Sequence, residues 1–404
     1  MSYTFNYDVS VILVNYNGRK YIDALFESLI RLKHDDFTYE IVFVDNDSTD
    51  GSVDYLKDKY ADKCNLNIVD TGANKGFAGG NNAGVKASNG KYIVLLNNDT
   101  AVDEKWLTNL YHFMLENPEC GMANSKLLFF YDFITIGFNT TDKVVIEKEI
   151  LINDKKYTID SKFCKNLLYE SEQLVCFGHT QICIPLLEGV GVESDYDIEI
   201  TVKSTVDGSE IKCADTVVEA NLGKSKLFLT RNFVKENKYS LIQNAGSGIN
   251  EEYDGFDRGF CEKDCEEYNK SCELTNGCGA SIMMLREDFD KAGCFDERFF
   301  MYYEDTDLSL RIKKLGKRIM FCPDSVVRHI HTGSSKEWSP FFTYHVYRNK
   351  LLMIGKNISK KEYWKYFLKQ YYLGIRHRDP MKRKGTVDSY KILFKNRDVH
   401  YEAE

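Results

Sequence analysis

The stretch YIVLLNND, from Tyr92 to Asp99, decides the fold, because an unbroken apolar run stops there in two amides and a carboxylate. The run from Tyr92 to Leu96 predicts a strand buried on both faces, which is typical of a central parallel strand. Ligands of open α/β sheets bind beyond the carboxyl ends of the strands, so we expect Asp99 to project there with Asn97 and Asn98. A lone Asp after a strand is also a common cap or turn residue, and a site here needs support from elsewhere.

Three further strands are predicted before this one, at Val9–Val14, Glu40–Val44 and Leu66–Val69. Helical segments separate them, the first with apolar residues at three- and four-residue steps. These are Ile22, Leu25, Leu29 and Leu32. The order of strand, helix and strand predicts an α/β fold with a right-handed, parallel, doubly wound sheet.

The segment TGANKGFAGGNNAGVKAS, residues 71–88, is crowded with glycine and asparagine. Glycines allow the backbone to approach a ligand closely, and amides can donate and accept hydrogen bonds at once. The spacing fits neither the dinucleotide fingerprint nor the P-loop. The alternative is a flexible turn that leads into a helix.

Composition limits the class of protein. A chain of 404 residues predicts two or three units, and 43% hydrophobic with 28% charged residues is typical of a soluble globular protein. The net charge of -8 argues against nucleic-acid binding. We find neither a signal segment nor a membrane-spanning apolar run, and expect a cytoplasmic protein with reduced thiols. The cluster of Cys261, Cys265, Cys272 and Cys278 leaves a zinc site open as an alternative to ordinary thiols.

From about residue 133 to 238 helical periodicity gives way to short alternating runs such as VVIEKEILI and YDIEITVKS. We interpret this segment as an inserted, sandwich-like β-rich module, because α/β-type sequence resumes at NGCGASIMML. Its role is left open between glycan binding, subunit pairing and shielding of a crevice.

The run CFDERFFMYYEDTDLSLRIKKLG predicts a helix with Glu304, Asp305 and Asp307 in its first turn. Asp307 and Arg311 form an i,i+4 pair that we interpret as structural. Complementation of the helix dipole would explain the other two carboxylates. A carboxylate preceded by aromatic residues that could flank a sugar or exclude water is also what a general base requires.

Two histidines, His329 and His331, follow a short predicted strand in RIMFCPDSVVRHIHTGSS. A lone histidine is commonly just a satisfied polar residue. Together with Asp99 and diphosphate oxygens, one imidazole would complete a mixed nitrogen and oxygen site suited to Mn²⁺ or Mg²⁺.

Eight motifs occur in an order that resembles family 2 glycosyltransferases of the bacterial rhamnosyltransferase type, with a GT-A fold. They are VILVNYN, VDNDSTDGS, NKGFAGGNNAG, LLNNDT, NGCGASIMM, DERFFMYYEDTDLSLR, PDSVVRHIHTGSS and YHVYRNKLLM. The resemblance covers about residues 8 to 130 and 240 to 358, and leaves out the β-rich segment. It implies a nucleotide-binding half at 1–132, the inserted module at 133–238, an acceptor and catalytic half at 239–340, and a C-terminal helical region at 341–404.

The resemblance also implies roles for individual residues. Asp305 matches the family's catalytic base, and Asp99 the metal-binding carboxylate of its Asp-x-Asp motif, whose first carboxylate is replaced by Asn97. His329 matches the metal-binding histidine, with His331 as the fallback, while Gly279 and Glu304 are expected near the acceptor. The nucleotide sugar is expected to contact Asn15, Tyr16, Asp45, Asn74, Lys75, Gly76, Asn81, Asn97 and Asn98.

The resemblance implies a metal-dependent, inverting hexosyltransferase that uses dTDP-rhamnose or a UDP-hexose and a glycan or lipid-linked acceptor in cell-surface polysaccharide assembly. The alternative is a non-catalytic glycan-binding protein that keeps the fold. An NAD-dependent enzyme is disfavoured by the missing glycine fingerprint.

The C-terminal region contains an apolar helical stripe followed by a basic segment. The stripe consists of Trp364, Phe367, Leu368, Tyr371, Tyr372 and Ile375, and Lys361, Lys365 and Lys369 flank it. A basic amphipathic helix can lie on an anionic membrane, so a peripheral position at its inner face is one prediction. The other is a helix docked on the catalytic domain or on a second subunit, which leaves a homo-oligomer open.

Overall fold

The computed structural model describes residues 4–34, 36–187, 195–330, 339–397, 399 and 401. They divide into two compact units. The first comprises Met1–Phe130, Gln243–Phe260 and Cys265–Glu404, and the second comprises Tyr131–Ile242 and Cys261–Asp264.

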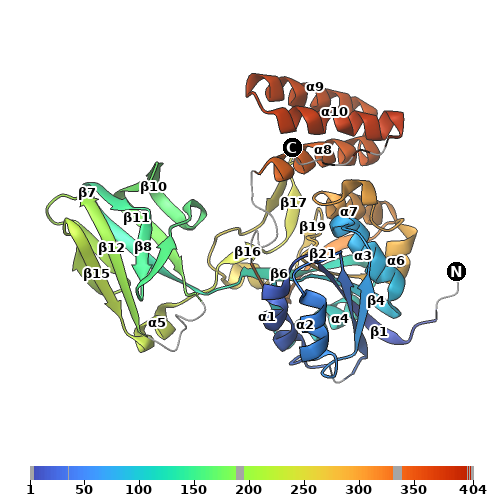
Figure 1. The fold of residues 1–404 in the computed structure, drawn as a ribbon, viewed down its shortest axis with the longest axis horizontal. Helices are drawn as coiled ribbons and strands as arrows, with labels where there is room; N and C mark the ends of the chain where they lie inside the picture. Colours follow the sequence, from blue (N-terminus) through green and yellow to red (C-terminus); the bar gives the residue numbers. More distant parts are fainter. Residues whose placement is uncertain are drawn as a thin grey trace. The chain divides into compact units, whose positions relative to one another are not determined.

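The first unit is built on a twisted, mixed sheet (Figure 1). Its strands are β1 (Tyr7–Asn15), β2 (Tyr39–Asp45), β3 (Leu66–Asp70), β4 (Gly90–Asn97), β5 (Thr100–Val102), β6 (Cys120–Phe129), β19 (Glu273–Leu274), β20 (Ser281–Leu285) and β21 (Arg318–His329). The order is β19-β21-β6-β20-β4-β1-β2-β3, and β5 pairs with β21. As predicted, β1 to β4 are mutually parallel where they pair; the apolar centres of β1, β2 and β4 are buried, and those of β3 are partly buried.

Helices cover both faces of this sheet. The helices α1 (Ile22–Leu29), α2 (Ser52–Tyr60) and α4 (Trp106–Glu116) pack on the face that includes Val11 and Val94. The helix α3 (Gly76–Ala87) lies against the other face, where Gly84 has no room for a side chain because Ile12 and Val44 fill the space. The pattern of alternating strands and helices therefore produces the three-layered packing of a doubly wound sheet that it predicts.

The sheet is not parallel throughout, which corrects the expectation of a parallel doubly wound sheet. β20 runs antiparallel to β4, with Ser281 opposite Leu96, and the backbone N–H of Asn97 donates to the carbonyl of Ala280 at 3.0 Å. An antiparallel neighbour puts the start of one strand beside the end of the other. The residues just before β20 are therefore placed beside the tip of β4.

β21 brings a third segment to the same place. Its last residue, His329, lies opposite Thr100 of β5, and the N–H of Ile330 donates to the carbonyl of Asp99 at 3.0 Å. The carboxyl end of β4, the start of β20 and the end of β21 thus meet at one edge of the sheet.

The remaining elements of the first unit are short strands and turns, and then a helical C-terminus (Figure 1). They are η1 (Arg19–Tyr21), β17 (Ser247–Ile249), β18 (Gly255–Asp257), η3 (Glu266–Asn269), α6 (Arg286–Lys291), η4 (Glu297–Phe299), α7 (Glu304–Lys314), α8 (Pro340–Asn357), α9 (Lys360–Arg376) and α10 (Pro380–Lys395), with β16 (Ile242–Asn244) at the unit boundary. Asp307 of α7 binds Arg311 at 2.7 Å, as the i,i+4 spacing predicts.

The second unit is an all-β sheet with one short helix, α5 (Arg231–Asn237). Its described strands are β7 (Phe133–Glu147), β8 (Glu149–Ile152), β9 (Lys155–Thr158), β10 (Cys164–Glu170), β11 (Gln173–Pro185), β12 (Tyr196–Ser204), β13 (Glu210–Cys213), β14 (Thr216–Glu219) and β15 (Gly223–Leu229). They are hydrogen-bonded into one sheet around their own apolar core. The predicted α/β class with an inserted all-β module and a C-terminal helical region is confirmed.

Within the described parts of the chain, no helix is both long and apolar enough to cross a bilayer. The same residues contain no group of three or more His, Cys, Asp or Glu arranged to hold a metal ion. The zinc site at the four clustered cysteines, the alternative to ordinary thiols, stays an untested prediction.

Candidate active site

The tip of β4 holds Asp99 in a tight turn. Thr100 Oγ1 donates to the Asn97 carbonyl at 2.7 Å and closes that turn, and Asp99 is only 3% exposed. Asn98 Nδ2 donates to Asn15 Oδ1 at 2.8 Å, which ties the tip of β4 to the tip of β1. The carboxylate predicted to mark the site is thus fixed by the ends of two parallel strands.

His329 faces this carboxylate. Its Nε2 lies 3.1 Å from Asp99 Oδ1 and 3.3 Å from Asn97 Nδ2, while its Nδ1 lies 2.8 Å from Gln243 Oε1. A carbonyl oxygen accepts, so the Nδ1–H of His329 donates to Gln243, and this contact turns Nε2 toward the Asp99 carboxylate.

An imidazole nitrogen and a carboxylate oxygen form a donor set that Mn²⁺ accepts, and hydrated Mg²⁺ less readily. The pair therefore fits part of a divalent-metal site, whose other ligands would come from outside this pair of side chains. His331, the fallback ligand, lies outside the described residues.

The predicted nucleotide residues cluster at the tips of β1 and β2. Asn15 is fully buried, and its Nδ2 donates to Ser48 Oγ and Ser52 Oγ at 3.0 and 2.9 Å. Asp45 accepts from the Ser48 N–H at 3.2 Å through Oδ2, whereas its buried Oδ1 has no partner. A buried carboxylate oxygen without a partner is costly, so it marks a point where a ligand donor would be favourable. Tyr16, which follows Asn15 in the sequence, is 50% exposed.

The glycine and asparagine segment forms the start of α3. Asn74 Oδ1 accepts from the Gly76 N–H at 2.9 Å, and the Lys75 N–H donates to Asn46 Oδ1 at 3.1 Å. Gly76 has φ +67°, and a Cβ there would collide with the Phe300 carbonyl oxygen. This close approach, which only glycine allows, brings the predicted nucleotide loop against the loop that precedes α7.

Asn81 is placed differently from the other predicted residues. It is buried on α3, and its Nδ2 donates back to the Phe77 carbonyl at 2.9 Å. This hydrogen bond within the helix gives Asn81 a structural contact that the sequence did not indicate.

Asp305 lies in the first turn of α7, and backbone N–H groups donate hydrogen bonds to its carboxylate. Its Oδ2 accepts from the Gly279 N–H at 3.0 Å and its Oδ1 from the Thr306 N–H at 2.7 Å. Loss of hydration raises the pKa of Asp305, and these hydrogen bonds oppose that rise in part. A carboxylate with a raised pKa and a fixed orientation is well suited to accept a proton.

Glu304 precedes it and is 5% exposed, with Oε2 lacking a partner. Burial raises the pKa of Glu304 well above 4.5, and the neighbouring Asp305 carboxylate raises it further. The two predicted acceptor residues, Glu304 and Gly279, therefore both adjoin Asp305.

The loop before α7 has an unusual backbone. Phe300, Tyr302 and Tyr303 have φ values of +64°, +72° and +67°, a region that bulky side chains rarely adopt. Such a run persists only where the surroundings hold it. The strained backbone leads directly into Asp305 and so determines where that carboxylate lies.

The helix α8 supplies the groups that hold this loop. Asn349, fully buried, donates from Nδ2 to the carbonyls of Phe299, Met301 and Tyr302, each at 2.8 Å. The buried Arg348 donates from Nη2 to the Phe299 carbonyl at 2.8 Å and orients Asn349 through Nε at 2.8 Å. The motif YRNK, to which the sequence assigns no role, therefore clamps the base-bearing loop.

His345 of α8 adds a packing contact. Its ring stacks on Phe300 at 5.5 Å, and both ring nitrogens are buried without a partner. Burial, aided by the nearby Arg348 charge, lowers the pKa of His345 to about 3, so the ring is neutral at physiological pH.

Three residues near the site were missed by sequence reasoning: Gln243, Asn46 and Asp257. Asn46 follows the tip of β2 just as Asn98 follows that of β4, so the strand-end rule would have found it. Gln243 and Asp257 follow the long insertion in very short strands and gave no periodic signal.

Asp257 connects the two halves of the site. Its Oδ1 accepts from Asn244 Nδ2 at 2.5 Å and Ser247 Oγ at 3.2 Å. Loss of hydration raises the pKa of Asp257, and the Asp305 carboxylate raises it further, while His329 lowers it. The Asp257 carboxylate thus interacts electrostatically with the predicted base and with the predicted metal ligand.

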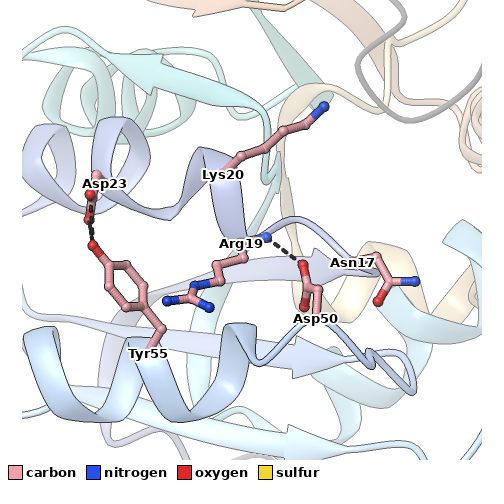
Figure 2. Close-up of a pocket in the computed structure, with 6 residues that line it drawn as sticks. All are labelled: Asn17, Arg19, Lys20, Asp23, Asp50 and Tyr55. Carbon is pink, nitrogen blue, oxygen red and sulfur yellow. Dashed lines mark hydrogen bonds between the residues drawn. The ribbon is translucent and has the colours of Figure 1, made fainter.

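A separate hollow of about 490 Å³ lies beside the tip of β1, lined by Asn17, Arg19, Lys20, Asp23, Asp50 and Tyr55 (Figure 2). Arg19 stacks over Tyr55 at 4.9 Å, and its N–H donates to Asp50 Oδ2 at 2.8 Å. Lys20 extends away from the other lining residues and interacts electrostatically with Asp99. Lys20 is therefore the member of this group that relates to the site.

Comparison with known proteins places this arrangement in a class. Residues 10–140 match the family profile described as glycosyl transferase family 2. A solved structure of GalNAc-T7 with UDP, GalNAc and Mn²⁺ superposes with a TM-score of 0.51 at 13% identity, covering 95% of this chain and 54% of that one. The fold is therefore the GT-A fold.

More particularly, the likeness to glycosyl transferase family 2 is shown for residues 10–140 of the chain. It is 31% identical over 113 residues to a poly(ribitol-phosphate) beta-glucosyltransferase of Bacillus spizizenii, covering 27% of this chain and 17% of that relative. It is 31% identical over 165 residues to the putative teichuronic acid biosynthesis glycosyltransferase TuaG of Bacillus subtilis, covering 41% of this chain and 63% of TuaG. The chain thus spans less than two thirds of both relatives.

We expect Asn349→Asp to lower the melting temperature by about 5 °C or more, because a carboxylate cannot donate to the three loop carbonyls and is itself buried. Differential scanning fluorimetry measures the change. Asn396→Asp, at an exposed left-handed position after α10, is the matched control and should stay within about 1 °C. Equal behaviour of the two variants would contradict the clamp.

We expect Glu304→Gln to raise the melting temperature by about 2 °C or more near pH 8, and to have progressively less effect toward pH 4.5. A carboxyl group with a raised pKa in the folded state holds more protons there than in the unfolded chain, so its ionisation costs stability as pH rises. Melting curves across this range test the trend, with the exposed Glu116→Gln as control. A gain that is larger in acid than in base would refute the assignment.

Proposed function

We propose that this protein is an inverting, metal-dependent glycosyltransferase that moves rhamnose or a hexose from a nucleotide-diphosphate donor to a glycan or lipid-linked acceptor. The observation that carries the proposal is Asp305, a carboxylate of raised pKa held by the Gly279 N–H next to the strand tip of Asp99 and His329. The names of its relatives in teichoic and teichuronic acid synthesis support a role in cell-surface polysaccharide assembly.

The donor would lie over the tips of β1, β2 and β4. The unpartnered Oδ1 of Asp45 would accept a hydrogen bond from the base, and the exposed ring of Tyr16 would pack against it. Lys75 and the start of α3 would face the rest of the nucleotide sugar, because helix N-termini favour anions. The donor would be dTDP-rhamnose or a UDP-hexose, as the resemblance implies.

Asp305 would act as the general base. Its carboxylate would take the proton of an acceptor hydroxyl while that oxygen attacks the anomeric carbon and the bond to the diphosphate breaks, which inverts the configuration. Glu304 and Gly279 would border the acceptor, and the clamp from α8 would keep the base oriented. Precise placement matters here because small displacements of a catalytic group cost large factors in rate.

Asp99 and His329 would hold a divalent ion, Mn²⁺ or Mg²⁺, whose chemistry is to neutralise the charge of the departing diphosphate. Gln243 would fix the His329 ring through Nδ1, which would leave Nε2 for the ion. Lys20 would add positive charge on the same side.

The alternative, a glycan-binding protein without activity, is disfavoured by the cost of keeping Asp305 and Glu304. Burial of carboxylates with raised pKa is destabilising, and a binder gains nothing from a base. In the same proposal the second unit would contact glycan, and the protein would work peripherally at the inner face of a membrane. Assays of donor hydrolysis with several nucleotide sugars separate the two functions.

We expect Asp305→Asn to keep donor binding and to lose turnover by roughly a hundredfold or more, the usual scale for a general base. Donor hydrolysis and transfer are measured with a panel of UDP- and dTDP-sugars in the presence of manganese. Asp62→Asn, an exposed change on the same unit, should have wild-type activity. Near-normal turnover of Asp305→Asn would exclude it as the base.

We expect Asp99→Ala to abolish manganese-dependent binding of the nucleotide, because one of only two protein ligands is lost. Titration calorimetry with UDP and dTDP, with manganese and with a chelator, measures the effect, and Asp62→Ala is the control. Unchanged manganese dependence in Asp99→Ala would remove this residue from the proposed metal site.

A further inference from the structure

The helix α9 presents an apolar face to solvent. Five large side chains there are 39% to 65% exposed: Trp364, Leu368, Tyr371, Tyr372 and Ile375. This is the stripe that the sequence left open between membrane contact and docking on the protein. The structure leaves it uncovered by the described parts of the chain, and contiguous exposed apolar side chains mark interaction surfaces.

The opposite side of α9 is firmly packed. Tyr363, Tyr366 and Gly374 are buried against the helical bundle, and a side chain on Gly374 would clash with Arg383 of α10. Gln370 Nε2 donates to the Tyr347 carbonyl of α8 at 2.9 Å. The helix therefore cannot rotate its apolar stripe inward without losing these contacts. Figure 1 shows α9 on the side of this bundle away from α8.

Aromatic stacking extends and stiffens this face. Trp364 stacks on Phe394 of α10 at 5.7 Å, and Phe367 stacks on Tyr371 at 6.2 Å. Trp and Tyr are the side chains that settle at the boundary between headgroups and acyl chains, because each has an apolar ring and a polar group. The composition of the face suits a lipid surface better than a dry protein core.

The charge of the surrounding bundle is strongly positive. Residues 339–397 contain fifteen Lys and Arg against three Asp and Glu, in a chain whose net charge is -8. Lys361, Lys365 and Arg376 are exposed on α9, on the helical face next to the apolar stripe. Anionic headgroups attract basic clusters that adjoin an apolar helix face.

We propose that the α9 face, defined by Trp364, Leu368, Tyr371, Tyr372 and Ile375 with the adjoining basic residues, docks onto an anionic lipid bilayer. A second copy of the chain is disfavoured as the occupant, because a symmetric contact would bring two strongly basic bundles together. The α9 face is thus the surface through which the protein would reach the membrane. This inference rests on the proposed function only for its biological purpose.

Vesicle flotation of the full-length protein tests the docking, without donor, acceptor or metal. We expect flotation with phosphatidylcholine vesicles containing about 30 mol% phosphatidylglycerol, little with phosphatidylcholine alone, and weakening at high salt. Leu368→Ser with Tyr372→Ser should reduce the bound fraction at least about tenfold. Lys361→Gln with Arg376→Gln should reduce it several-fold on anionic vesicles.

Matched controls separate docking from general stickiness and from catalysis. Leu222→Ser with Phe228→Ser removes apolar side chains that are 72% and 59% exposed in the second unit, and should float like the wild type. Asp305→Asn should also float normally, so failure of the proposed chemistry would leave this result intact. Melting temperatures verify that every variant is folded.

Two outcomes would overturn the proposal. One is no flotation on anionic vesicles, or flotation that the α9 changes leave unaltered. The other is concentration-dependent dimerisation in light scattering that Leu368→Ser with Tyr372→Ser abolishes, which would assign the face to a second copy of the chain.

Discussion

The carbonyl of Phe300 is the point on which the site depends. It accepts from the Ala78 N–H at 3.1 Å and lies so close to Gly76 that no side chain could stand there. This contact joins the start of α3, where the nucleotide is expected, to the loop that delivers Asp305. Because the loop backbone is strained, the contact alone would not hold it, and Asn349 supplies the compensating hydrogen bonds from behind. Hydrogen bonds therefore link the start of α3, the loop that precedes Asp305 and the helix α8.

The strands and helices before residue 130 could largely be predicted from the sequence, because buried strands and amphipathic helices have characteristic patterns of apolar residues. Asp99 and Asp305 were found because each lies where a recognisable pattern changes. Asp99 follows the end of an apolar run, and Asp305 lies at the start of a helix. The antiparallel direction of β20 was not predictable, because a five-residue apolar strand reads the same in either direction. The left-handed run at Phe300, Tyr302 and Tyr303 opposes local propensity and exists only through tertiary contacts.

Contacts across long sequence separation explain the other omissions. Gln243 reaches His329 across 86 residues, and Asn349 reaches Phe299 across 50. Neither has a local pattern, because an amide whose hydrogen-bond partner is distant in sequence needs no particular neighbours in its own strand or helix. Asp257 is similar, since its interaction with Asp305 and His329 depends on a small hairpin that only the folded chain places there.

The net charge of the whole chain does not reveal that its charges are unevenly distributed. A net charge of -8 argues against general nucleic-acid binding, yet the helical C-terminus is strongly basic. The helix α8 connects the two properties, because one part of its surface clamps the base-bearing loop while another supports α9 and α10. Nearly all sides of α8 are therefore buried, and a change within it would disturb the base and the outer helices together. The exposed side of α9, by contrast, can be altered without reaching Asp305, so surface binding and chemistry can be separated there.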